Sequence, residues 1–508
     1  MLEVRDPADV RSVVAEVPAM SASEVAAAYT RARAGFGAWR HTNPLDRAAV
    51  MARCADLIRA RAEEGAVTLV RENGKTLAEA RVEVAKTADF LDYYASFARQ
   101  PWGEILADAR GGTQTTVRYE PVGVVLAITP WNDPLLTPAR KLGPALIAGN
   151  AIVLKPASQT PQVALWLADL LMAAGLPGNV VSVVTGEQRE IGATLLGHPE
   201  LDALTFTGST EIGNHLRRAL ADRKVRLQAE TGGKNASVVL ADADLELAAA
   251  TVAAAAFGQA GQRCTATSRL IVDASVASGL LELLRSRAEA CVLGPGLDAA
   301  TTLGPLAMPG HRDDVLAHIG KATAEGATVL TGGDRPAAAS LEYGCYVSPT
   351  IISVDTRHSL WREEVFGPVV AVCEANGFDE AVKLANDSRY GLSAAVFTND
   401  LRLANEFIDR AEAGQVSVNL PTSGWDVHHP FGGFRESGSP FKEQGSDAGH
   451  ARLEFPQLGA GQPAHARHAV GGRPALEFLQ LAGFRVVPGD HQLAALVPHQ
   501  PAVRAVVP

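Results

Sequence analysis

The sequence lacks the features expected of a membrane-spanning, nucleic-acid-binding or disulfide-linked protein. No apolar run reaches the roughly 18–20 residues that cross a bilayer, and no basic segment followed by an apolar core resembles a secretory signal. Basic residues are not in excess, because 46 Lys and Arg stand against 56 Asp and Glu. The net charge of −10 therefore argues against a nucleic-acid partner, whose phosphates need clustered cations. Only five cysteines occur, scattered and without metal-ligand spacing, which predicts reduced thiols in a cytoplasmic protein with no metal site.

The length and the pattern of the chain predict more than one α/β domain. A chain of 508 residues is too long for one simple core. The first hundred residues have a helical pattern, and from residue 122 short β-branched runs alternate with helical stretches, which predicts a parallel sheet covered on both faces. The expected strands are 122–128, 151–154, 180–184, 204–207 and 225–229, with helices at 138–147, 161–174 and 210–220. A second alternating series spans 236–418, with strands near 268–272, 369–373, 394–397 and 416–419. We expect two α/β domains with a cleft between them.

Residues 456–508 have a different composition from the rest of the chain. This tail contains no lysine, and its acids are Glu477 and Asp490. Residues 475–482 could form a helix, but the tail has no sustained periodicity. We interpret it as a loosely ordered extension.

Three side chains predict covalent catalysis. Cys264 follows a glycine-rich polar turn after an alanine-rich helix, where a partly exposed sulfur near backbone N–H groups would favour the thiolate. Glu230 ends an apolar run, and Asn132 follows the run 122–128. A lone cysteine is usually a small buried hydrophobe. A thiol, a carboxylate and an amide in loops that each follow a strand instead supply a nucleophile, a base and a hydrogen-bond donor for acyl chemistry.

Two loops predict a dinucleotide site. Residues 206–213 form a strand, a glycine turn and a helix start, where backbone N–H groups suit a pyrophosphate, although the spacing is not GxGxxG. Lys155 lies just past the strand 151–154 and could contact ribose hydroxyls or a phosphate; alternatively it is a surface charge. Ligands of a parallel sheet usually bind at the carboxyl ends of its strands.

Taken together, these motifs resemble the aldehyde dehydrogenase superfamily from about residue 10 to 445. The matching segments, in order, are 130–132, 149–156, 206–213, 230–234, 261–264, 363–368 and 430–433. The resemblance implies an α/β fold with a Rossmann-type cofactor domain, an α/β catalytic domain and a small oligomerisation β-element. The implied boundaries are 1–102 and 121–232 for the cofactor domain, 233–435 for the catalytic domain, 103–120 and 436–455 for the oligomerisation element, and 456–508 for the atypical tail.

The resemblance also implies the reaction, an NAD(P)-dependent oxidation of an aldehyde. Cys264 would attack the carbonyl carbon, the Asn132 amide and the Cys264 backbone N–H would hold the oxyanion, and Lys141 would lie behind that site. Glu230 would activate the water that hydrolyses the thioester. The implied cofactor-binding residues are Trp131, Lys155, Ser158, Gly208, Ser209, Gly232, Glu364 and Phe366.

Ser158 departs from the pattern of NAD-preferring members, which commonly carry a glutamate at this position. A carboxylate would repel a 2′-phosphate, whereas a neutral serine beside Lys155 would tolerate one. We therefore predict use of NADP, or of both NADP and NAD.

The substrate pocket is expected to favour a short acid semialdehyde. Arg140 resembles an arginine with which succinate-semialdehyde-type members grip a carboxylate; alternatively it neutralises Asp133 or faces solvent. Residues 414–424 and 442–445 look most like those of 2-oxoglutarate-semialdehyde-type enzymes. The expected substrate-binding residues are Asp133, Arg140, Arg263, Thr265, His428 and Phe431.

The resemblance implies a homodimer or homotetramer joined through a strand at 113–120 and a final C-terminal strand. Pro456 stands where that last strand should continue, and proline is poorly tolerated in a central strand. Either the strand is shortened, or the tail supplies another contact, for example over a substrate tunnel; an out-of-frame reading of the gene end would also give this composition.

Two other functions are compatible with the sequence. A CoA-acylating semialdehyde dehydrogenase would pass the thioester to CoA, but such members typically lack the carboxylate found at Glu230. A catalytically impaired scaffold is the alternative outside catalysis.

Overall fold

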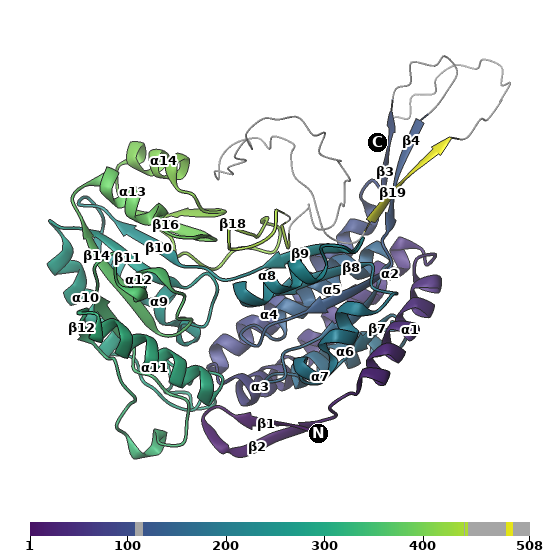
Figure 1. Cartoon of the computed structure of the whole chain (residues 1–508), viewed down its shortest axis with the longest axis horizontal. Helices are drawn as coiled ribbons and strands as arrows, with labels where there is room; N and C mark the ends of the chain where they lie inside the picture. Colours follow the sequence, from purple (N-terminus) through teal and green to yellow (C-terminus); the bar gives the residue numbers. More distant parts are fainter. Residues whose placement is uncertain (107–114, 441, 445–483, 491–508) are drawn as a thin grey trace, which may run out of the picture.

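The computed structural model describes residues 1–106, 115–440, 442–444 and 484–490, and two large sheets organise the chain (Figure 1). The first sheet has five parallel strands in the order β7-β6-β5-β8-β9. Its strands are β5 (Val124–Ile128), β6 (Ala151–Lys155), β7 (Val181–Val183), β8 (Ala203–Thr207) and β9 (Arg226–Glu230). The order reverses between β5 and β8, the kind of switch point at which open α/β sheets bind ligands.

Helices cover both faces of this sheet because its inner strands are apolar on both sides. Val125 and Ala127 of β5 belong to one core cluster, and Val124 and Leu126 belong to another. Alternate residues of a strand point to opposite faces, so each face of β5 is buried. The helices of this half are α1 (Ala22–Trp39), α2 (Pro44–Ala60), α3 (Ala62–Asn73), α4 (Leu77–Ala95), η1 (Ser96–Arg99), α5 (Leu136–Ala148), α6 (Gln162–Ala173), α7 (Gln188–Gly197) and α8 (Thr210–Ala219).

The second sheet has seven strands in the order β12-β13-β14-β11-β10-β16-β17, parallel except for the edge pair β12–β13. Its strands are β10 (Asn235–Val239), β11 (Thr267–Asp273), β12 (Thr328–Thr331), β13 (Thr350–Ser353), β14 (Val369–Ala375), β16 (Ser393–Phe397) and β17 (Gln415–Val418). The accompanying helices are α9 (Leu245–Phe257), η2 (Gly258–Gly261), α10 (Ala277–Glu289), α11 (Pro309–Ala324), η3 (Ala339–Leu341), α12 (Ser359–Arg362), α13 (Phe378–Asn386) and α14 (Leu401–Arg410). A short pair, β15 (Tyr390–Gly391) and β18 (Phe434–Arg435), lies beside it.

The strands and helices predicted from residue 122 onward agree with these elements to within about two residues, the usual uncertainty of a helix or strand boundary. The helical prediction for the first hundred residues is wrong at its beginning, where β1 (Leu2–Asp6) and β2 (Asp9–Val17) pair as a hairpin. Of the residues in these two strands only Val4 and Val17 are buried, so the sequence carries little of the alternation that marks a strand. In the described part of the chain, no helix is long and apolar enough to cross a membrane.

A third sheet, of three antiparallel strands, projects from the body of the molecule (Figure 1). Its order is β19-β4-β3, built from β3 (Gly103–Leu106), β4 (Thr115–Pro121) and β19 (Phe484–Asp490). The interpretation of the tail as a loosely ordered extension is therefore wrong for residues 484–490, where backbone pairing runs from Phe484 opposite Pro121 to Asp490 opposite Thr115. The alternative that the tail supplies another contact agrees with this strand. Pro456 and the predicted element at 445–455 lie outside the described residues.

Candidate active site

The predicted catalytic residues Asn132 and Glu230 lie at the carboxyl ends of strands, and Cys264 lies at the amino end of a strand, near the junction between the two large sheets. Asn132 follows β5, Glu230 ends β9, and the segment after Glu230 leads directly into β10. Cys264 lies between η2 and β11. The folding of two parallel sheets thus brings together side chains that are distant in sequence.

The turn before Cys264 has an unusual backbone. Gln259 and Ala260 both have a φ of 52°, in the left-handed region that residues with a Cβ seldom adopt. Gly261 follows with a φ of 70°, and a Cβ there would lie 2.0 Å from the carbonyl oxygen of Gly367. Such backbone conformations persist where surrounding contacts hold them, commonly at functional sites. The cysteine turn is thereby packed directly against the loop that carries Glu364 and Phe366.

Cys264 is only partly exposed, and its surroundings keep the thiol protonated. Burial raises the pKa of Cys264; Arg140 opposes this shift, while the carboxylates of Asp133 and Glu364 increase it. The expected thiolate-favouring environment is therefore not what the structure shows, because burial and acids outweigh the nearby cation. The sulfur needs a proton acceptor in order to act as a nucleophile.

Asn132 is buried against the cysteine turn. Its Nδ2 donates a hydrogen bond to the carbonyl oxygen of Gln262, two residues before Cys264, at 2.9 Å. An amide nitrogen carries two protons, so one N–H remains to bind an oxygen near the sulfur. The structure thus brings Asn132 and Cys264 together, as predicted.

A buried ion pair that sequence reasoning missed holds the Asn132 loop in place. Lys75 Nζ donates to the backbone oxygen of Asn132 at 2.9 Å and forms an ion pair with Glu83. Glu83 also accepts hydrogen bonds from the backbone N–H groups of Leu135 and Leu136, at 2.9 and 3.0 Å. In one sequence both residues look like ordinary surface charges of the helical region, and no local signal distinguishes them.

Glu230 is almost completely buried, with 1% exposure. Its Oε1 accepts a hydrogen bond from Gln228 Nε2 at 3.1 Å, and its Oε2 has no hydrogen-bond partner in the described part of the chain. Burial, reinforced by the charge of Glu443, raises the pKa of Glu230 well above its ordinary value, although Lys141 opposes the shift. A carboxyl with an elevated pKa and a free oxygen is suited to general base catalysis near neutral pH.

Lys141 forms a buried ion pair that the sequence also did not predict. Its Nζ donates to Glu443 Oε1 at 2.6 Å and to Thr205 Oγ1 at 3.0 Å. Burial lowers the pKa of Lys141, an effect that Glu443 opposes. The resemblance of the segment 442–445 to known enzymes gives no indication that Glu443 pairs with Lys141. The pair fixes the residues after β18 against β8 and β9.

The guanidinium group of Arg140 lies against two aromatic rings. Its guanidinium carbon is 5.0 Å from the ring centre of Phe431 and 5.4 Å from that of Phe90. Its Nη1 is 3.6 Å from Glu443 Oε2, and its Nε has no hydrogen-bond partner among the described residues. The side chain is 17% exposed, so the alternative that it faces solvent does not hold.

Asp133 is held by groups other than Arg140. Its Oδ1 lies 3.5 Å from Lys75 Nζ and accepts a hydrogen bond from Gln259 Nε2 at 3.2 Å. Gln259 Oε1 in turn accepts from Arg263 Nε at 2.7 Å, so one amide joins the predicted pocket residues Asp133 and Arg263.

The last two predicted substrate-binding residues, Thr265 and His428, take no part in these contacts around Asp133 and Arg140. Thr265 is buried, and its carbonyl accepts a hydrogen bond from Thr422 Oγ1 at 2.7 Å. His428 has a side chain that is 56% exposed, and its Nδ1 lies 3.5 Å from Asp426 Oδ2. No contact of His428 with the catalytic groups is seen, so its role as a pocket residue stays a prediction.

The predicted nicotinamide side of the cofactor site is assembled around Glu364. Its Oε1 accepts a hydrogen bond from the backbone N–H of Gly233 at 2.8 Å, and burial raises the pKa of Glu364 to about 7. A Cβ on Gly232 would lie 2.2 Å from Glu364 Oε2, so only glycine leaves room for this carboxyl group. The fit supports the predicted roles of Gly232 and Glu364.

Aromatic rings complete that side of the site. The rings of Trp131 and Phe366 meet edge to face, with centres 5.4 Å apart. His311, which sequence reasoning missed, lies 5.1 Å from Trp131 and its Nε2 is 2.7 Å from the carbonyl oxygen of Phe366. The left-handed φ of 57° at Phe366 is held by these contacts.

The predicted adenosine side lies at the ends of β6 and β8. Lys155 Nζ donates to the carbonyl oxygen of Pro156 at 2.8 Å, and burial lowers the pKa of Lys155 to about 8. Ser158 Oγ donates to the carbonyl oxygen of Gly186 at 3.1 Å. Ser209 caps α8, accepting a hydrogen bond from Ile212 at 3.3 Å, and Gly208 precedes it in the turn from β8. A helix N-terminus beside a lysine suits a dinucleotide phosphate, so the residues present fit the cofactor.

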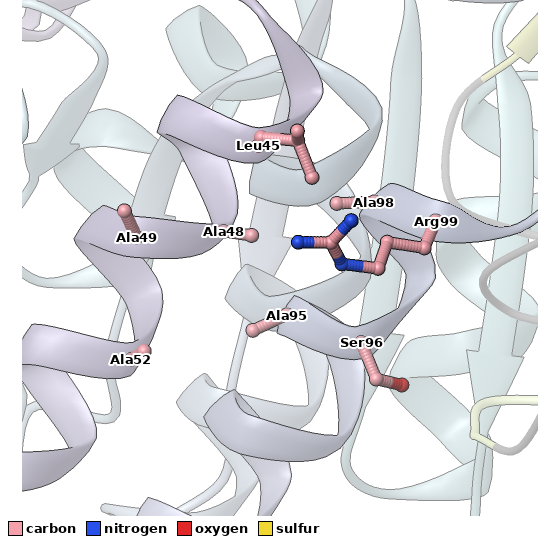
Figure 2. A pocket seen from close by; sticks show the side chains of 8 residues that line it. All are labelled: Leu45, Ala48, Ala49, Ala52, Ala95, Ser96, Ala98 and Arg99. Atoms are coloured by element: carbon pink, nitrogen blue, oxygen red, sulfur yellow. The ribbon is translucent and has the colours of Figure 1, made fainter. Parts of the chain in front are cut away.

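A hollow of about 250 Å³ lies elsewhere, between α2 and the end of α4 with η1 (Figure 2). Its lining is mostly alanine, and Arg99 is the one charged side chain among the eight residues drawn. It contains none of the predicted catalytic groups.

Known proteins share this fold and this order of motifs. The model of the aldehyde dehydrogenase family matches residues 1–456. An alpha-ketoglutarate semialdehyde dehydrogenase of Haloferax volcanii is 41% identical over 449 residues, covering 88% of this chain and 92% of that protein. The NADP/NAD-dependent aldehyde dehydrogenase PuuC of Escherichia coli is 39% identical over 463 residues, covering 90% and 91%. A betaine aldehyde dehydrogenase of Staphylococcus aureus, solved in complex with NAD+, superposes with a TM-score of 0.85 at 34% identity, covering 87% of this chain and 88% of that one.

The chain belongs to the aldehyde dehydrogenase family. It is an oxidoreductase that oxidises an aldehyde with a nicotinamide dinucleotide.

Proposed function

We propose that the aldehyde is a short semialdehyde of a carboxylic acid, of the succinate-semialdehyde or 2-oxoglutarate-semialdehyde type. The observation that carries this proposal is Arg140, a largely buried guanidinium whose Nε has no hydrogen-bond partner among the described residues and whose charge acts on Cys264. Arginine is well suited to grip a carboxylate by two hydrogen bonds. The relative from Haloferax volcanii, an alpha-ketoglutarate semialdehyde dehydrogenase, supports the same substrate class.

In the first step, Cys264 attacks the aldehyde carbon after losing its proton. The free amide N–H of Asn132 and the backbone N–H of Cys264 bind the oxygen that becomes negative. The thiol proton goes to the carboxylate of Glu230, directly or through one water, because the surroundings of the sulfur oppose the thiolate. Glu364, Phe366 and Trp131 would hold the nicotinamide end of the cofactor, which, when bound, would supply the oxidation by accepting a hydride.

Glu230 then releases the thiol proton to solvent, and in the second step the ionised carboxylate removes a proton from the water that attacks the thioester on Cys264. Burial keeps the basicity of this carboxylate high, and its Oε2 is free to accept the proton. A positioned base of this kind contributes roughly 10²–10⁴-fold to a rate. The C–S bond then breaks, the acid leaves, and the thiol is restored.

For the cofactor we propose NADP, or dual use of NADP and NAD. Position 158 carries a neutral serine in place of a carboxylate, so a 2′-phosphate near Lys155 would not be repelled by that side chain. The Escherichia coli relative, whose name covers both cofactors, supports dual use.

We also propose that the protein acts in the cytoplasm as a homodimer or homotetramer. The projecting sheet β19-β4-β3 is the element proposed to join subunits, because it has two edge strands outside the body of the fold (Figure 1). The domain boundaries predicted at 102, 120, 232 and 435 are retained as part of this proposal.

The test is a reduced-cofactor absorbance assay with 2-oxoglutarate semialdehyde, succinic semialdehyde and butanal, each with NAD+ and with NADP+. We expect kcat/KM for the acid semialdehydes to exceed that for butanal by about tenfold or more, the scale of one charged hydrogen bond, and NADP+ to be used at least as well as NAD+. The Cys264→Ser variant is the inactive control. Arg140→Ala should lose activity selectively on the acids; equal losses on acid and neutral aldehydes would defeat the carboxylate anchor.

A further inference from the structure

Lys86 lies on the face of α4 that contacts the active-site loops. One turn earlier, Glu83 accepts two hydrogen bonds, at 2.9 and 3.0 Å, from backbone N–H groups at the start of α5. One turn later, the ring of Phe90 lies 5.4 Å from the guanidinium carbon of Arg140. Residues three and four apart on a helix share a face. Lys86 therefore stands between two contacts that both reach the pocket wall.

The charged groups that act on Lys86 come from four other parts of the chain. They are Arg140 of α5, Arg263 beside the catalytic cysteine, Asp133 after β5, and Asp426 in the loop before Pro430. Lys86 is half-buried, and burial, followed by the charges of Arg140 and Arg263, lowers its pKa. The two cations thus outweigh the two acids in their effect on this ammonium group.

Both acids are already engaged by other residues. Asp133 is held by Lys75 and Gln259, at 3.5 and 3.2 Å. Asp426 is exposed and pairs with His428 at 3.5 Å. Lys86 itself has no hydrogen bond or ion pair with any described residue.

The neighbouring cations Arg140 and Arg263, unlike Lys86, each have a polar partner. Arg140 has Glu443 at 3.6 Å, and Arg263 donates to Gln259 at 2.7 Å. Partial burial of a lysine whose ammonium group has no acid partner among the described residues carries a cost. An anion that enters beside it would recover that cost, and the arriving substrate is the anion that the proposed function supplies.

We propose that Lys86 is a specificity-determining residue of the substrate pocket, where its ammonium group binds the carboxylate of the aldehyde acid together with Arg140. This inference rests on the proposed substrate class. Arginine can fix the carboxylate by two directed hydrogen bonds, while lysine adds a compact charge that approaches from a different helix. Two cations on adjacent helices thereby favour an anionic aldehyde over a neutral aldehyde of equal length.

The test compares the Lys86→Met and Lys86→Arg variants on succinic semialdehyde and on butanal. Methionine keeps the length of the side chain and removes the charge, whereas arginine keeps the charge. We expect Lys86→Met to lower kcat/KM for succinic semialdehyde by about tenfold to hundredfold, the range for one hydrogen bond to a charged group. The loss should appear mainly in KM, butanal should be oxidised as by the parent, and Lys86→Arg should recover most of the activity on the acid. Lys383→Met, which removes a charge from the exposed side of α13, is the matched control.

The pH dependence gives a second readout. Because its pKa is lowered, Lys86 loses its charge below the pH at which an exposed lysine would. KM for succinic semialdehyde should therefore rise with pH in the parent. This rise should be absent in Lys86→Met, and absent in Lys86→Arg because arginine stays charged.

The outcomes separate the two proposals. A parent enzyme that oxidises butanal as efficiently as the acid semialdehydes overturns the substrate class, and the role of Lys86 with it. A parent that prefers the acids, combined with a Lys86→Met variant that keeps this preference, overturns the role of Lys86 alone. Equal losses on both substrates also overturn it, because a merely structural residue would cause them.

Discussion

In the proposed mechanism the carboxyl group of Glu230 exchanges a proton while it is buried beside another acid. Its folded-state pKa is raised well above the ordinary value by burial and by Glu443. Water activation requires the ionised form. The hydrolytic step should therefore accelerate as the pH rises through this raised pKa, at a pH where an exposed glutamate is already fully ionised.

We expect kcat of the parent enzyme to increase with pH on this account, and the Glu230→Gln variant to lose about 10²–10⁴-fold in kcat together with that pH dependence. The measurement is a pH profile of steady-state turnover, and the rate of the pre-steady-state burst of reduced cofactor shows how much of the loss arises in the Cys264 step, in which Glu230 accepts the thiol proton. A variant that keeps the parental profile would contradict the role of Glu230.

The stability of the same variant provides its control. A carboxyl with a raised folded-state pKa binds its proton more tightly in the native state, so its contribution to stability is lost as the pH rises through that pKa. Glutamine carries no charge there. Glu230→Gln should melt at or above the parental temperature at alkaline pH, which separates loss of chemistry from loss of folding.

Single residues were predictable where a local pattern marks them. Asn132 stands in a loop after β5, Glu230 ends β9, and Cys264 follows the glycine-containing turn η2, and the structure brings these elements to one junction. Glu443 could not be given its role, because its partner Lys141 is 302 positions earlier in the chain. Only the packing of the loop after β18 onto β8 and β9 makes them neighbours.

The contact between α4 and α5 depends on one buried ion pair. Lys75, just before α4, binds Glu83 within that helix, and Glu83 accepts hydrogen bonds from the start of α5. Removing one partner of a buried pair leaves an uncompensated charge.

We expect Lys75→Met to destabilise the protein by about 3–5 kcal/mol, the usual cost of breaking a buried pair. The double variant Lys75→Met with Glu83→Gln should recover part of this loss, because neither charge remains. Urea unfolding midpoints followed by fluorescence provide the measurement. A single variant with the parental midpoint would show that the pair contributes nothing to the fold.

Among the secondary-structure elements, the parallel strands were the most predictable. Runs such as 124–128 and 151–154 are apolar throughout, because both of their faces are buried by helices. The β1–β2 hairpin was missed because most of its side chains are partly or fully exposed, so no apolar pattern identifies it. The edge strand β12 and its neighbour β13 were not predicted either.

At the scale of the whole molecule, the strand β19 could not be predicted from the amino-acid composition of residues 456–508. It pairs with β4 along the full length of both strands and makes β4 a central strand. Without β19, β4 would present an unpaired edge, the kind of surface through which chains associate indiscriminately.

Truncation after Phe455 should therefore change the assembly while sparing the chemistry. We expect light scattering to show larger and heterogeneous species, and kcat to be retained because Cys264, Glu230 and Glu443 all precede the cut. Truncation after Asp490, which keeps β19, should preserve the parental mass. An unchanged mass in the shorter chain would show that β19 is dispensable for assembly.

The ion pair between Lys141 and Glu443 also affects how the enzyme is made. During translation the cofactor-side sheet and Lys141 leave the ribosome long before residue 443 is synthesised. Until then the ammonium of Lys141 lacks its acid, and the carboxyl of Glu230 lacks the neighbour that reinforces its basicity. A nascent chain, or a product of premature termination before this position, thus contains Cys264 but lacks the charge of Glu443 beside Lys141 and Glu230. The full set of charges around the site is present only after residue 443 has been added.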